Sequence, residues 1–271
     1  TFGAIITVFS QQRDIASIWA WLLVLIMLPV LGFIIFFFVG SRISDKRIFR
    51  LRTQEQLGLE QIADNQRRQL EAIEQLLPIP NSATELANLF LRTDESVLTR
   101  GNKIKIFTNG PDKFKALFED IRQATHHVHL EYFTIDDDQI GNQLVDLLTE
   151  KAREGVDVHV IFDQFGSHGQ HRDMYKRLRE AGGVVAPFLM RRFQLLTLRF
   201  NFRNHRKIAI IDGKIGYIGG LNVGDQYVDR SKKFGHWRDT HLRIHGDAVL
   251  SLQSRFLMDW NATAEENELL V

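Results

Sequence analysis

The chain has 271 residues, enough for one large domain or two small ones, and a formal net charge of +1 at pH 7. This nearly neutral charge favours no particular class of partner. The absence of cysteine excludes disulfides, catalytic thiolates and cysteine zinc sites, whereas 10 histidines leave a histidine-based site open. Because the first residue is Thr1 and not methionine, we expect a piece of a longer protein.

The first informative segment is residues 15–40, a run of 26 residues without a charged side chain. Roughly 20 apolar residues cross a bilayer core, so this length predicts a transmembrane helix. A buried core helix is the alternative, but soluble helices seldom stay uncharged for so long. Trp19 and Trp21 lie near one end, as residues at a membrane interface do. Residues 1–10 are apolar and too short to span, so we expect the tail of a preceding membrane segment.

Basic residues gather after the predicted span. Only Arg13 precedes it, whereas five basic residues follow closely, namely Arg42, Lys46, Arg47, Arg50 and Arg52. The positive-inside rule then places everything after residue 41 in the cytoplasm. Residues 41–80 are charged and rich in glutamine, which predicts a helical connector near the membrane surface. A plain solvated helix fits this pattern equally well.

Residues 81–271 alternate between strand and helix patterns. Strands are predicted at 103–108, 126–134 and 156–162, and helices at 110–124, 140–154, 172–181 and 247–260. Such alternation predicts an α/β domain in which helices cover a sheet. Asp212 and Gly213 lie between two β-branched runs and predict a two-residue hairpin turn, because both residues tolerate a positive φ.

The clearest chemistry lies in HRKIAIID, residues 205–212, which is followed by GGLN, residues 219–222. On a strand, His205 and Lys207 point to the same face, so an imidazole and an ammonium converge. A neutral imidazole is a good nucleophile toward phosphorus, and the ammonium would neutralise phosphoryl oxygens. Asp212 has the opposite parity and is most simply a turn residue.

A nucleophilic histidine needs its other ring nitrogen held, usually by a carboxylate. Asp239 begins another alternating segment and is the best candidate, although an ordinary acid at a strand start fits as well. Lys207 and Asn222 are natural charge and amide donors for a phosphate. The glycines before Asn222 are weak evidence for phosphate binding when taken alone.

These residues carry a resemblance to a known family. HRKIAIIDGKIGYIGGLN matches the HxKxxxxD and GGxN signature of the phospholipase D superfamily at every signature position. The uncharged span, EYFTIDDDQIG and WRDTHLRIHGDAV extend the resemblance to bacterial cardiolipin synthases over nearly the whole chain. It implies a phospholipase D-like layered sheet-and-helix domain in residues 81–271, preceded by a transmembrane helix. It also implies a bacterial cell membrane location with the catalytic domain in the cytoplasm.

The resemblance further implies a reaction. The motif histidine would attack the phosphodiester of one phosphatidylglycerol, release glycerol and carry the phosphatidyl group until a second phosphatidylglycerol takes it to form cardiolipin. No cofactor, metal or nucleic acid is implied. The residues so assigned are His205, Lys207, Asp212 and Asp239 in catalysis, and Lys207, Asn222 and Gly220 in phosphate binding.

Members of this family carry two such motifs, and the second histidine protonates the leaving glycerol oxygen. The 271 residues contain one HxKxxxxD motif, so the resemblance covers the first half of a two-motif enzyme. A C-terminal half or a homodimer would supply the other motif. The alternatives left open are a membrane-tethered phospholipase D-type phosphodiesterase or nuclease, and an inactive half that needs the second motif.

Residues 181–211 contain no acidic side chain and interleave arginine with phenylalanine. Such a surface suits anionic lipid headgroups, with the rings entering the interface. Single-stranded nucleic acid, or a strand with a solvated basic face, fits the same pattern, and the neighbouring span favours lipid. The residues predicted to face the headgroups are Arg191, Arg192, Arg199 and Arg203.

His126, His127 and His129 form a second histidine-rich segment. Metal ligation would call for acids on the same strand face, and Glu131 is the only nearby acid of the right parity. We therefore interpret these histidines as strand residues, with a metal cluster as the alternative.

Overall fold

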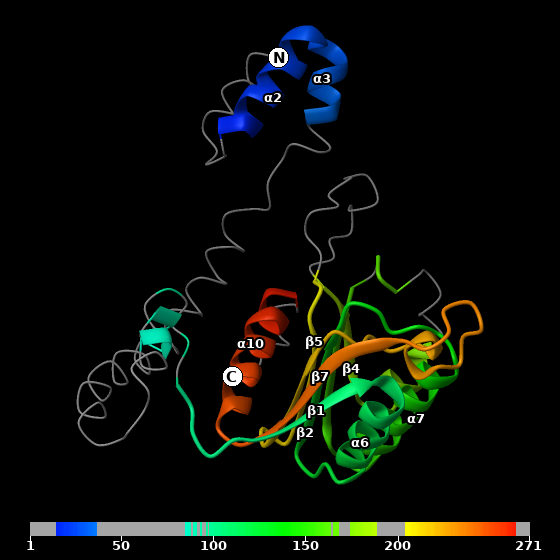
Figure 1. Cartoon of the computed structure of the whole chain (residues 1–271). Helices are drawn as coiled ribbons and strands as arrows, with labels where there is room; N and C mark the ends of the chain where they lie inside the picture. The colour runs from blue at the N-terminus through cyan, green and yellow to red at the C-terminus, as the bar shows by residue number, and fades with distance from the viewer. Residues whose placement is uncertain are drawn as a thin grey trace. The chain divides into compact units, whose positions relative to one another are not determined.

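A computed structural model of the chain describes residues 15–36, 98–163, 165–167, 174–188 and 204–263, with isolated residues between 85 and 96 (Figure 1). The chain divides into two compact units. Residues 15–36 are the described part of the first unit, and the second unit contains the α/β domain. The predicted segments 1–10 and 41–80 lie outside the described residues.

The first unit contains two helices, α2 (Ile15–Met27) and α3 (Pro29–Ile35). The chain leaves helical geometry at Leu28, with φ −130° and ψ 71°. The cause is Pro29, which lacks an N–H and whose ring crowds the preceding turn. Within the span predicted over 15–40, the described residues therefore form two shorter helices, and residues 37–40 lie outside the described part. Among the described residues, no helix combines the length and the apolar character that crossing a membrane requires.

The two helices pack closely against each other. A Cβ on Gly32 would lie 2.6 Å from the Val24 carbonyl oxygen, so only glycine allows this approach. The Trp21 ring meets the Phe36 ring edge to face, with centroids 5.2 Å apart. Around this contact, large apolar side chains remain exposed, including Ile15, Trp19, Leu23, Ile26, Met27 and Val30.

The second unit is built on a mixed sheet whose described strands run in the order β1-β7-β6-β5-β2-β3-β4. Strands β2, β3 and β4 are parallel, and the remaining neighbours pair antiparallel. The strands are β1 (Lys103–Asn109), β2 (His127–Tyr132), β3 (Asp157–Phe162), β4 (Val184–Pro187), β5 (Lys207–Ile211), β6 (Ile215–Gly219) and β7 (Arg238–His245).

Helices cover both faces of this sheet, which confirms the predicted α/β class. Helices α6 and α7 lie on one face and α10 on the other, as Figure 1 shows. The parallel strands need such crossover helices, whereas the antiparallel pair β5 and β6 is joined by a short turn. The helices are α6 (Gly110–Arg122), α7 (Gln139–Arg153), α9 (Lys176–Glu180) and α10 (Ala248–Thr263), with a 3-10 turn, η3 (Asp225–Val228).

Alternation along the strands divides the core in two. Leu130, Ala209 and Tyr217 belong to the cluster shared with α6 and α7, whereas Ile208 and Ile210 belong to the cluster with α10. Lys207 has the parity of Ala209, so its side chain starts on the α6 and α7 face. The alternation along β5 thus determines that the motif lysine lies on the face of the sheet that α6 and α7 cover.

The predicted strands and helices appear near their expected positions, with two differences. The helix predicted over 172–181 appears as α9 over Lys176–Glu180, and residues 172 and 173 lie outside the described residues. Asp212 and Gly213 form the predicted turn with φ values of 53° and 64°. The connection between β5 and β6 has three residues, Asp212 to Lys214, because Ile211 pairs with Ile215.

Candidate active site

His205 and Lys207 converge at the start of β5, as their spacing predicts. His205 is exposed, whereas Lys207 is 3% exposed. The Lys207 ammonium donates a hydrogen bond to the His205 carbonyl oxygen at 2.7 Å. The ammonium lies 5.3 Å and the imidazole 5.0 Å from the centroid of the Phe133 ring. An accessible imidazole therefore stands beside a sequestered positive charge.

The surroundings shift the pKa of both groups. Burial lowers the pKa of Lys207 to about 8, although the charge of Asp239 raises it. Burial, and then the charge of Lys207, lower the pKa of His205 below its ordinary 6.5. At neutral pH the imidazole is mainly neutral, with a lone pair to offer, and the ammonium is still mainly charged. These protonation states suit attack on a phosphorus centre.

The end of β2 brings Asn222 to the same end of the sheet. Tyr132, the last residue of β2, pairs with Lys207, and Thr134 follows shortly after it. The Thr134 N–H donates to the Asn222 Oδ1 at 3.2 Å, and the Asn222 Nδ2 donates to the Tyr227 hydroxyl at 2.9 Å. An amide nitrogen carries two hydrogens, so one remains for a ligand.

Asp239 lies at the start of β7, against Gly220. A Cβ on Gly220 would lie 2.1 Å from the Asp239 Oδ1, which explains the glycine at this position. The Asp239 carboxylate accepts a hydrogen bond from the Thr240 N–H at 2.7 Å. Within the described part of the chain it makes no hydrogen bond to His205. Its effect on the site in this structure is the charge that it exerts on Lys207.

Asp212 lies at the other end of β5 from Lys207. Its carboxylate accepts hydrogen bonds from the three backbone N–H groups of residues 125–127 and from the Thr125 hydroxyl. Burial raises the pKa of Asp212, but these hydrogen bonds outweigh burial and lower the pKa below 3.8. Asp212 thus joins the β5–β6 turn to the start of β2, and the structure does not bring it to His205.

Comparison with known proteins identifies the family. Residues 117–260, more than half of the chain, match the family model described as cardiolipin synthase, PLD-like domain. The chain belongs to this family. Residues 1–41 also match the model described as phospholipase D-nuclease N-terminal.

Individual relatives agree with this assignment. The cardiolipin synthase of Listeria innocua is 43% identical over 99% of this chain and 56% of its own length. The major cardiolipin synthase ClsA of Bacillus subtilis is 41% identical over 98% of this chain and 56% of its own length. The chain therefore spans just over half the length of these relatives. The solved structure of NucT from Helicobacter pylori aligns with a TM-score of 0.47 at 17% identity, covering 60% of this chain and 98% of that chain.

In this cardiolipin synthase-family chain, a buried polar network that the sequence did not reveal anchors the motif. The Asn204 N–H donates to the Asp163 carboxylate at 3.1 Å, and the Asn204 amide donates to Glu131. The Arg206 guanidinium lies 2.8 Å from the Asp259 carboxylate and 3.8 Å from Glu131. Burial, and then the charge of Asp259, raise the pKa of Glu131. The network fixes the residues on both sides of the motif histidine.

Lys113, Tyr132 and His241 form a second group that was not predicted. All three are fully buried, and the Lys113 ammonium donates to the Tyr132 hydroxyl at 2.9 Å. Burial lowers the pKa of Lys113 well below 10.5. Burial, then the charges of Lys113 and Lys207, lower the pKa of His241 to about 2. The available signal was Lys113 itself, a charged residue among the apolar positions that α6 turns toward the sheet.

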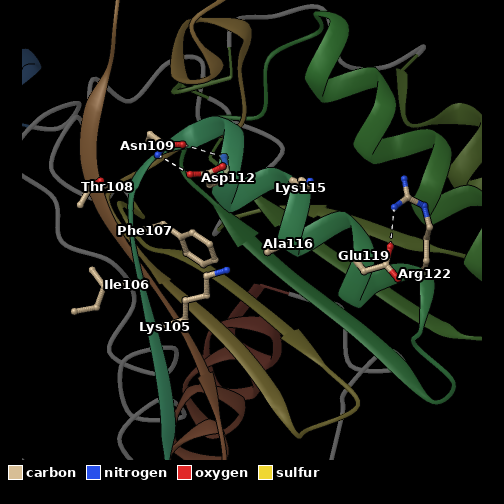
Figure 2. Close-up of a pocket in the computed structure, with 10 residues that line it drawn as sticks. All are labelled: Lys105, Ile106, Phe107, Thr108, Asn109, Asp112, Lys115, Ala116, Glu119 and Arg122. Carbon is tan, nitrogen blue, oxygen red and sulfur yellow. Dashed lines mark hydrogen bonds and ion pairs between the residues drawn. The ribbon is translucent and has the colours of Figure 1, made fainter.

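Two further features stand apart from this site. The predicted headgroup residues Arg191, Arg192, Arg199 and Arg203 lie outside the described residues. A groove between β1 and α6 contains none of the predicted site residues, and Figure 2 shows Asn109 capping α6 there through the Asp112 N–H at 2.9 Å. The groove is lined by Lys105, Ile106, Phe107, Thr108, Asn109, Asp112, Lys115, Ala116, Glu119 and Arg122.

Proposed function

We propose that this chain provides one half-site for phosphatidyl transfer in cardiolipin synthesis. The observation that carries the proposal is the exposed His205 imidazole beside the buried Lys207 ammonium. Relatives named cardiolipin synthase support the choice of phosphatidylglycerol as substrate and cardiolipin as product. Because the chain spans just over half their length, the activity of the whole protein is part of the proposal.

In the first step, a His205 ring nitrogen attacks the phosphorus of one phosphatidylglycerol. The new P–N bond forms as the bond to the glycerol oxygen breaks, which gives a phosphatidyl-histidine and glycerol. Lys207 and the remaining amide hydrogen of Asn222 neutralise the nonbridging oxygens, beside the backbone of Gly220. Asp239 turns toward the nonattacking ring nitrogen and stabilises the imidazolium that forms. The leaving oxygen takes a proton from an acid of the second motif.

In the second step, a glycerol hydroxyl of another phosphatidylglycerol attacks the phosphatidyl-histidine. The proton of this hydroxyl passes to the second-motif residue that donated a proton in the first step. His205 is released as the P–N bond breaks. The products are cardiolipin and glycerol, and the protein returns to its starting state. The second motif comes from a C-terminal half or from a second copy of the chain. Asp212 supports the motif from the β5–β6 turn without touching the phosphate.

The proposal includes a place for the chain at the bacterial cell membrane. The exposed apolar side chains of α2 and α3 suit contact with lipid, and the basic residues after residue 41 favour a cytoplasmic catalytic domain. Arg191, Arg192, Arg199 and Arg203 would bind the anionic headgroups, which delivers phosphatidylglycerol to the site.

The test joins this chain to the second-motif half of the Listeria innocua relative and measures cardiolipin formed in phosphatidylglycerol vesicles. We expect His205→Ala to abolish product and to prevent trapping of an acid-labile phosphohistidine. The matched control is His236→Ala, at an exposed histidine outside the site, and it should retain activity. Unchanged product from His205→Ala would refute the proposal. Release of phosphatidic acid alone, or cleavage of added single-stranded DNA, would favour the phosphodiesterase or nuclease alternative.

A further inference from the structure

We propose that His129, Asp157 and His159 form a binding site for a divalent transition-metal ion. His129 and His159 are direct partners in the parallel pairing of β2 with β3, and Asp157 lies two residues earlier on the same face of β3. One ligand atom from each residue lies within 4.8 Å of the other two. This inference goes beyond the proposed function and does not depend on it.

The histidines present buried nitrogens that lack partners. His129 is 5% and His159 6% exposed. Among the described residues, neither the His129 Nε2 nor the His159 Nδ1 has a hydrogen-bond partner. The His159 Nδ1 is only 3.1 Å from the Asp157 Oδ1, but not in hydrogen-bonding geometry. Buried polar atoms are nearly always satisfied in proteins, and a shared cation would satisfy both nitrogens at once.

A glutamine behind the site can hold the tautomer that a metal needs. Gln253 of α10 places its amide between two rings, 2.8 Å from the His129 Nδ1 and 3.0 Å from the His127 Nε2. In the structure the amide nitrogen faces the His129 Nδ1 and the amide oxygen faces the His127 Nε2. Turning the amide by 180° exchanges the two atoms and puts the oxygen toward His129. The His129 Nδ1 then carries the proton and donates it, which leaves the Nε2 lone pair free for a metal. Metal-bound histidines commonly have such a hydrogen-bonded partner on the other nitrogen.

Other titratable groups near the three proposed ligands are not counted among them. Nearby, His126 is an exposed histidine and Asp212 an acid that already accepts hydrogen bonds from residues 125–127.

Two imidazoles and one carboxylate suit Zn²⁺ and its first-row neighbours, with water in the remaining position. Asp157 has 53% of its side chain exposed, which gives the ion a route from solvent. Phe256 stacks on His129 at 4.6 Å and Trp260 meets His159 edge to face at 4.4 Å, both from α10. The ion would hold β2 and β3 together under this helix, on the face opposite Lys207.

The experiment titrates the 271-residue chain, purified without a histidine tag, with Zn²⁺ by calorimetry and with Co²⁺ by visible absorption. We expect one ion per chain and a rise in Tm of about 5 °C or more at a hundredfold excess over Kd. Asp157→Asn and His159→Gln should each weaken binding at least about 100-fold, and Gln253→Ala about 10- to 100-fold. His126→Gln is the matched control and should bind like the unaltered chain.

Asp157 is exposed, so its substitution should leave the fold intact, and far-UV circular dichroism checks this. Binding below one ion per chain, or no change in Tm, would overturn the proposal. So would affinity that survives both Asp157→Asn and His159→Gln, or that is lost in His126→Gln. None of these readouts depends on phosphatidyl transfer, so failure here leaves the proposed function untouched.

Discussion

The ammonium of Lys207 is hydrogen-bonded to the backbone carbonyl of His205, two residues earlier in the chain and just before β5. The nucleophile candidate and the cation candidate are thus joined through the backbone and not through the imidazole, whose nitrogens stay available. A phosphate that binds between them would compete with the His205 carbonyl for the hydrogen bond that the Lys207 ammonium donates.

Replacing Lys207 with Met should remove activity while sparing the fold. The loss of one charge at the phosphoryl oxygens should reduce kcat about 100- to 1000-fold in the joined protein. Stability should hold or rise, because burying an ammonium is unfavourable and Met fills a similar volume. Cardiolipin assays and thermal unfolding measure the two effects. Lys214→Met, at an exposed turn position, is the control. Retention of more than about a tenth of the activity would contradict the role of Lys207.

The dependence of kcat/KM on pH should be bell-shaped. Activity needs a neutral His205 and a charged Lys207, so kcat/KM should rise through a pKa below 6.5 and fall above about 8. Lys207→Arg tests the assignment, because a guanidinium stays charged in this range. Its alkaline limb should move upward or disappear, even if the rate is lower. An alkaline limb that stays in place would belong to another group.

Glu131 should affect stability in a pH-dependent way. Its pKa is raised in the folded state, so its contribution is complete below the ordinary 4.5 and declines as pH rises through the folded pKa. Glu131→Gln mimics the neutral acid and should remove this dependence. Glu131→Ala leaves the Asn204 amide unpaired and should lower the free energy of unfolding by about 1–3 kcal/mol. Urea unfolding between pH 4 and 9 measures both, with the exposed Glu150→Gln as control. Equal pH slopes in Glu131→Gln and the unaltered chain would argue against a neutral Glu131.

Asp212→Asn should affect stability more than chemistry. Asparagine tolerates the positive φ, but its single oxygen cannot serve the N–H groups of residues 125–127 as a carboxylate does. We expect a loss of about 1–3 kcal/mol in the free energy of unfolding. Because the pKa of Asp212 is lowered on folding, the difference should shrink as pH falls below 3.8. His205→Ala provides the opposite pattern, with activity lost and unfolding unchanged. A normal unfolding free energy with abolished turnover in Asp212→Asn would indicate a direct catalytic role.

Local patterns in the sequence were sufficient for much of the fold and for the centre of the site. Strand parity predicted that His205 and Lys207 converge, and the Asp212-Gly213 pair predicted its turn, because both depend on neighbours in the chain. Apolar periodicity likewise located α6, α7 and α10. These features need no knowledge of what packs against them.

Other features depend on partners that are distant in the sequence. The close approach of Gly32 to Val24 depends on how α2 and α3 pack against each other, which no local pattern reports. The burial of Glu131 depends on Asn204 and Asp259, which come from other elements. Spacing likewise predicted that the Asp239 carboxylate lies near the motif, but it could not predict the orientation of that carboxylate.

The pairing of β1 with β7 has a consequence for synthesis. β1 is an edge strand of the described sheet, and its partner β7 is the last described strand in chain order. Until residues 238–245 leave the ribosome, β1 and β6 both lack the strand that lies between them. A nascent chain that stops before Arg238 would carry the complete HxK motif on a sheet from which β1 is still separate.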